Sequence, residues 1–164
     1  MRKFSSLLST AFVASLFVVA TSCKDDDDQK SRTDLLTGKS WTVVKAQAEV
    51  NGQFVDVPGS DYVSACSADN AITFTKAGAY KQTAGADDCN GDETEESGTW
   101  AWKDNEGTIA LTIKDGSDTY LQDLPVLSLS ESELKVQIDT IPFDTNGDGK
   151  DDAEVKIYLT LQGK

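Results

Sequence analysis

Apolar residues stand at every second position in several short segments of this chain, and that period restricts the folds open to it. In the clearest segment, Ile109, Leu111 and Ile113 alternate with smaller or polar residues. Successive side chains of a β-strand point to opposite faces, whereas an amphipathic helix needs apolar residues three or four positions apart. The pattern therefore predicts strands that bury one face, and it recurs at Leu134, Val136 and Ile138 and at Val155, Ile157, Leu159 and Leu161.

Turn signals separate the predicted strands. Asn51-Gly52 is the strongest, because both central residues of a type I′ hairpin turn need a positive φ. It should join a strand over 41–50 to one over 53–57. A short helical turn over 33–38 is predicted to precede these strands. Later strands are separated by glycine-containing turns over 76–78, 104–107 and 115–116.

The number of strands and the lack of a long helical period predict an all-β, antiparallel fold of about eight to ten short strands. An up-and-down β-barrel is the economical closure, because it removes exposed sheet edges and leaves one inward apolar face per strand. The order of the strands in the sequence leaves a two-sheet β-sandwich open as the alternative.

The first residues have the features of a secretory signal. Arg2 and Lys3 precede an apolar run over 7–20, whose roughly 14 residues are too few for a comfortable membrane span. The small residues just before Cys23 resemble a lipobox, which predicts cleavage before this cysteine and lipidation of its thiol. The alternative is an ordinary cleaved signal followed by a free cysteine. We therefore divide the chain into a signal peptide (1–22), a lipidated, acidic, flexible tether (23–34) and a β-barrel domain (35–164).

Four consecutive aspartates follow Lys24. This segment resembles the acidic export signal of surface-exposed lipoproteins of the Bacteroidetes type. The resemblance implies an outer-membrane protein that is lipid-anchored at Cys23 and faces the medium. Two or three acyl chains would hold it there, because each buried methylene contributes about 0.8 kcal/mol. A solvated spacer on a lipoprotein that faces the periplasm is the alternative.

The net charge argues against nucleic acid as a partner. Removal of residues 1–22 takes away Arg2 and Lys3 and changes the formal net charge from −13 to −15. A chain this acidic repels phosphate backbones.

The chain has three cysteines, at 23, 66 and 89. If lipidation uses Cys23, then Cys66 and Cys89 are the remaining thiols in an oxidising compartment, and we expect them to form a disulfide. In the chain-entropy model this bond would stabilise the domain by roughly 3 kcal/mol. Metal binding by the pair is disfavoured, because the sequence contains no histidine and no CxxC motif.

One acidic loop resembles the start of a calcium-binding loop. Hard oxygen donors at alternate positions suit Ca²⁺, and Gly149 permits the sharp turn that such loops need. The loop differs from an EF-hand, because Val155 stands at its twelfth position and strands flank it. The alternative is a polar hairpin turn. If calcium binds, it should stabilise the last hairpin. The predicted ligands are Asp144, Asn146, Asp148, the carbonyl of Lys150, and Asp152.

Two other groups of residues are weaker candidates. A second acidic segment, which ends at Glu95-Glu96, lacks the glycine and the alternation of a cation site and is predicted to be a solvated loop, with a weak cation site as the alternative. Trp41, Trp100 and Trp102 are candidates for lining a ligand pocket. The alternative for the tryptophans is packing in the core or on the surface.

Short motifs lie at the start of the first strand (36–41), around one turn (74–80) and at 98–100, together with the cysteine pair. They resemble the lipocalin-like domains of bacterial lipoproteins. This resemblance implies a small barrel that can hold an apolar ligand.

Two functions remain open from the sequence. The first is a surface-anchored lipoprotein whose barrel binds a small apolar or amphipathic molecule. The second is a non-enzymatic interaction or structural module, with a filled barrel whose loops bind a protein or a glycan. An internal cavity of about 300 Å3 or more would favour the first function. An enzyme is not expected, because no histidine is present and the two remaining cysteines should be bonded.

Overall fold

The computed structural model describes residues 30–57, 67–86, 95–115, 118–143, 149–150 and 153–164. These residues form one short α-helix, one 3-10 turn and nine strands. The helical elements are α1 (Arg32–Thr37) and η1 (Ser67–Asp69). The strands are β1 (Ser40–Val50), β2 (Gln53–Asp56), β3 (Ala71–Phe74), β4 (Ala79–Thr83), β5 (Glu96–Lys103), β6 (Thr108–Asp115), β7 (Asp118–Leu129), β8 (Glu133–Phe143) and β9 (Ala153–Gly163).

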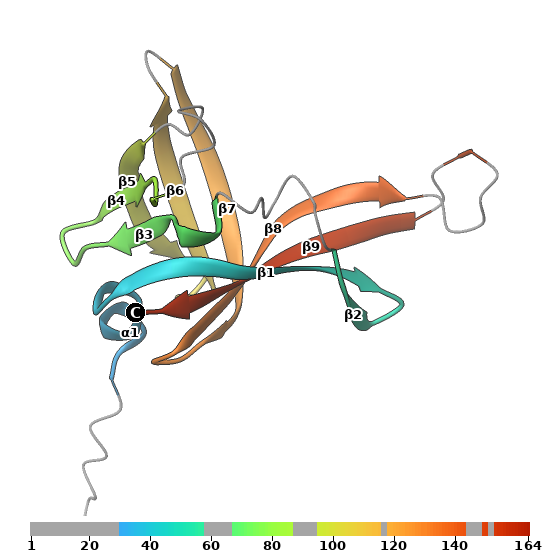
Figure 1. Ribbon diagram of the computed structural model, residues 1–164, viewed down its shortest axis with the longest axis horizontal. Coiled ribbons are helices and arrows are strands. Elements are labelled where there is room, and N and C mark those ends of the chain that lie inside the picture. Colours follow the sequence, from blue (N-terminus) through green and yellow to red (C-terminus); the bar gives the residue numbers. More distant parts are fainter. Residues whose placement is uncertain (1–29, 58–66, 87–94, 116–117, 144–148, 151–152) are drawn as a thin grey trace, which may run out of the picture.

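The strands form a closed antiparallel barrel (Figure 1), as the sequence predicts. Consecutive strands from β3 to β9 pair with one another, β3 pairs with the start of β1, and β9 closes the barrel against β1. Eight strands therefore make the barrel. The extra strand, β2, pairs with the end of β1 beyond the part that β3 occupies. The two-sheet sandwich is excluded, because one continuous sheet closes on itself.

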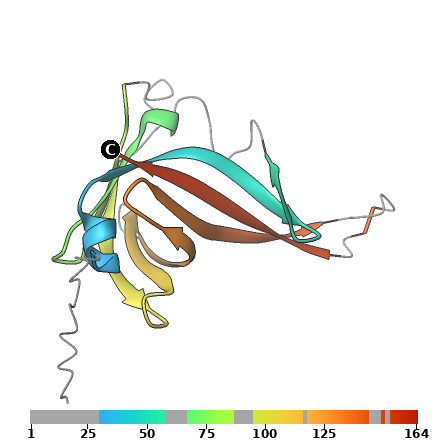
Figure 2. The ribbon, with the colours of Figure 1, turned by 90° about the horizontal axis from the view of Figure 1, so that it is seen from below.

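Part of the sheet extends beyond the barrel. The far ends of β8 and β9 continue together away from the barrel, and β1 and β2 lie alongside them (Figures 1 and 2). The predicted Asn51-Gly52 turn joins β1 to β2, with φ values of 51° and 75°. Val155 and Ile157, which the alternation places on the inward face, are buried in this extension.

The outer face of the extension carries an aromatic and charged cluster. The ring of Phe54 packs edge-on against Tyr158, with 5.2 Å between the ring centroids. Lys135 Nζ lies 3.4 Å from the Phe54 centroid. The Tyr158 hydroxyl donates a hydrogen bond of 2.8 Å to Glu49. The contacts of Phe54 with Tyr158 and Lys135 fix the short strand β2 to the neighbouring strands.

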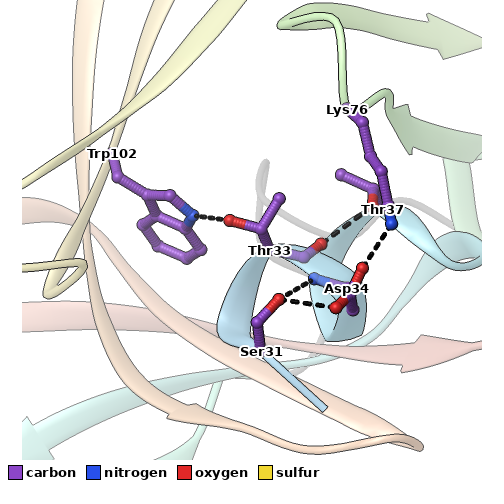
Figure 3. Close-up of polar contacts among 6 residues, drawn as sticks. All are labelled: Ser31, Thr33, Asp34, Thr37, Lys76 and Trp102. Atoms are coloured by element: carbon purple, nitrogen blue, oxygen red, sulfur yellow. Dashed lines mark hydrogen bonds and ion pairs between the residues drawn. The ribbon is translucent and has the colours of Figure 1, made fainter.

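Helix α1 covers one end of the barrel. Its N-cap is Ser31, whose Oγ accepts a 3.0 Å hydrogen bond from the Asp34 amide (Figure 3). The helix therefore begins slightly before the predicted turn. Asp34 also forms an ion pair with Lys76 in the β3–β4 turn. Leu36 is fully buried, and the helix thus closes the barrel end at which the β3–β4 and β5–β6 turns lie.

Within the described residues, no helix has the length and apolar composition needed to cross a bilayer.

Candidate functional site

The barrel interior holds a cavity of about 530 Å3 that is partly open to solvent. This volume lies within the range of small-molecule pockets, which is about 300–1,000 Å3. Most of its lining is apolar and comes from β3, β6, β7, β8 and β9. The apolar lining includes Phe74, Ile109, Leu111, Leu124, Leu134, Val136, Ile138, Leu159 and Leu161.

Cross-strand pairing explains how these side chains meet inside the barrel. Leu134 lies opposite Leu161, and Val136 lies opposite Leu159. Directly opposed residues in an antiparallel sheet point to the same face, so each pair contributes two apolar groups to the cavity wall. Leu134 and Val136 are only 2% and 3% exposed. The alternation in the sequence therefore predicts this wall correctly.

The three tryptophans do not line this cavity. They lie near α1, and each indole Nε1–H donates to a nearby oxygen: Trp41 to the Leu36 carbonyl (2.8 Å), Trp100 to the Thr75 carbonyl (2.9 Å) and Trp102 to Thr33 Oγ1 (3.0 Å; Figure 3). The rings of Trp100 and Trp102 meet edge-to-face, with centroids 5.7 Å apart. Their arrangement corresponds to the alternative considered from the sequence, which is packing at the closed end of the barrel.

Polar groups gather at the other end of the cavity. The carboxylate of Glu96 accepts hydrogen bonds from the hydroxyls of Tyr80 (3.5 Å) and Tyr120 (3.2 Å). All three residues line the cavity. Burial and the adjacent Glu96 carboxylate raise the pKa of Tyr80, so its hydroxyl stays protonated over the physiological range. Tyr120 is 41% exposed, which places this end of the cavity at the protein surface.

Glu96 corrects one prediction from the sequence. The acidic segment that includes Glu95 and Glu96 is predicted to be a solvated loop, yet Glu96 is the first residue of β5 and pairs with Gln82 of β4. Glu95 does meet the expectation, because it is exposed and forms a 3.0 Å ion pair with Lys81. A signal for Glu96 was present in the sequence, since it stands an even number of residues before Trp100 and therefore on the same face of the strand.

Several predicted site residues lie outside the described part of the chain. They are Cys23, the pair Cys66 and Cys89, and four of the five calcium ligands, Asp144, Asn146, Asp148 and Asp152. Lys150 is described and exposed. In the described part of the chain, no group of three or more acidic or cysteine side chains is placed to hold a metal ion. Lipidation, the disulfide and calcium binding therefore stay predictions.

A closed antiparallel barrel with an apolar internal cavity and a few polar groups at one end defines a ligand-binding β-barrel. Residues 36–136 match the family of the lipocalin-like domain. The matched segment covers more than half of the chain, and the protein belongs to this family. None of the curated proteins matches the sequence.

Proposed function

We propose that this protein is a surface-anchored lipoprotein whose barrel binds a small apolar or amphipathic molecule. The observation that carries the proposal is the cavity of about 530 Å3 with its apolar lining. A filled barrel that engages a protein or a glycan through its loops is the less favoured function, because side chains leave this interior partly empty. The proposal is of a binding protein and not an enzyme, in keeping with the generally non-enzymatic lipocalin-like family.

Binding can be measured with N-phenyl-1-naphthylamine, a neutral probe whose fluorescence rises in apolar surroundings. Val136→Phe adds a ring at a position that lines the cavity, so we expect at least a tenfold loss of probe affinity. Leu127→Phe is the matched control, because Leu127 is 52% exposed and does not line the cavity. Near-ultraviolet circular dichroism verifies that both variants fold. Equal affinity of the two variants would contradict binding inside the barrel.

The anchor is proposed from the sequence alone. Metabolic labelling with an alkyne fatty acid should label the wild-type chain, and Cys23→Ser should abolish the label. Protease treatment of intact cells then separates an outward-facing protein from one that faces the periplasm. A labelled protein that resists protease in intact cells would support the lipid anchor and contradict the surface location.

Calcium is proposed as a structural ion, with Asp144, Asn146, Asp148, Lys150 and Asp152 as ligands. A chelator should lower the melting temperature of the wild-type chain and leave the Asp148→Asn variant unchanged, because ligand binding stabilises the folded state. An identical melting temperature of the wild type with and without chelator would contradict the binding of calcium.

The proposed disulfide between Cys66 and Cys89 can be tested by peptide mapping under non-reducing conditions.

A further inference from the structure

The cavity is polar at one end only, and its polar end carries a single negative charge. Among the described residues that line it, Glu96 is the one with a charged side chain. We infer that the ligand is an amphiphile whose head is a protonated amine, held by the Glu96 carboxylate. This inference rests on the proposed binding function and specifies the class of ligand.

The geometry of Glu96 leaves room for such a head. Tyr80 and Tyr120 each donate one hydrogen bond to a different carboxylate oxygen, at 3.5 and 3.2 Å. A carboxylate offers about four lone-pair sites, so about two acceptor sites are left for a ligand. No lysine or arginine of the described segments forms an ion pair with Glu96. The two tyrosines thus hold the carboxylate in place, and the negative charge has no cationic partner among these residues.

The neighbouring groups discriminate against an anionic head. A carboxylate ligand would bring a second negative charge beside Glu96 at the edge of a low-dielectric cavity, where like charges repel strongly. Tyr80 is only 6% exposed, and its hydroxyl already donates to Glu96. The remaining polar lining consists of neutral residues, Gln82, Tyr120 and Gln122.

The rest of the lining sets the orientation of the ligand. Along β7, the inward positions Tyr120, Gln122 and Leu124 lead from the polar end toward the end that α1 covers. Opposite Gln122 and Leu124 stand the apolar side chains of Leu111 and Ile109, which line the same cavity. An apolar tail would therefore point toward α1, with the amine at the Glu96 end.

The test compares three ligands with the same tail, decylamine, decanol and decanoate, in displacement of N-phenyl-1-naphthylamine at neutral pH. Decylamine should bind the wild-type chain at least tenfold more tightly than decanoate. Glu96→Gln should lower decylamine affinity about tenfold, because it removes a charged hydrogen-bond acceptor, and should leave decanol nearly unchanged. Glu95→Gln is the matched control, since it makes the same change of net charge at an exposed residue that does not line the cavity.

The outcomes separate the two proposals. Decanoate binding as tight as decylamine, or equal effects of Glu96→Gln and Glu95→Gln, would overturn the amine assignment while the binding function stands. The comparison of decylamine with decanoate on the wild type decides the matter even if Glu96→Gln does not fold. Failure of the wild-type chain to bind the probe at all would refute the binding function and the amine assignment with it.

Discussion

Replacement of Leu36 by alanine tests whether α1 is a structural part of the barrel. Leu36 is 0% exposed and belongs to the core cluster that also holds Trp41, Phe74 and Trp100. Leu36→Ala removes three carbon atoms from this core, which at about 0.8 kcal/mol each amounts to about 2.4 kcal/mol. The space left behind adds to this, and similar substitutions cost about 2–5 kcal/mol. We expect a loss of about 3 kcal/mol in the free energy of unfolding.

Urea titration monitored by tryptophan fluorescence measures this loss, because all three tryptophans lie near α1. For a domain of this size, about 3 kcal/mol corresponds to a drop in melting temperature of roughly 12 °C. Leu127→Ala is the control, since Leu127 is 52% exposed on β7 and should cost less than about 0.5 kcal/mol. If both variants lose the same small amount, then α1 does not share the cooperative core of the barrel.

Two further predictions concern the barrel wall. At Gly98 an added Cβ would lie 2.0 Å from the Thr112 carbonyl oxygen, so Gly98→Ala should cost about 1–3 kcal/mol by overpacking. Ser97→Ala, at an exposed position of the same strand, should cost less than about 0.5 kcal/mol. Thermal unfolding of the two variants checks this order, and the reverse order would contradict it. Burial and the hydrogen bond to Glu49 raise the pKa of Tyr158 from 10.0 to about 12. The unfolded chain therefore releases the proton of the Tyr158 hydroxyl at lower pH than the folded chain does. The stabilisation that comes from the protonated Tyr158 is fully present below pH 10 and is lost as the pH rises to about 12. Urea unfolding at a series of pH values should show that loss, and Tyr158→Phe should reduce it; an identical alkaline loss in the variant would assign it to other groups.

The strands follow from local sequence patterns, and the barrel that the sequence favours is confirmed, but the pairing that closes the sheet could not be predicted. Local alternation at Ile109, Leu111 and Ile113 and the Asn51-Gly52 turn depend on neighbouring residues alone, and the structure confirms both. The pairing of β1 with β9 joins the two ends of the domain and includes a register irregularity between Val43 and Lys45. Such a long-range match leaves no local trace, so a sandwich could not be excluded.

The candidate binding site could be predicted from the sequence in part. Its apolar wall follows from the same alternation, but its polar end was missed because Glu96 follows a run of acidic residues that reads as a loop. Tyr80 and Tyr120 meet Glu96 only because β4 and β7 flank β5 and β6 in the barrel. The tryptophans were candidates for the pocket lining because they are large aromatic residues. In the structure, each indole nitrogen donates to a partner near α1.

The position of α1 also determines how the barrel would be oriented if the protein is anchored through its N-terminal segment. The chain enters the barrel through α1, and Glu96 and Tyr120 lie at the opposite end of the cavity. With such an anchor, the barrel end that α1 covers would face the membrane, and the open end of the cavity would point away from it. A ligand could then bind and dissociate while the protein stays anchored.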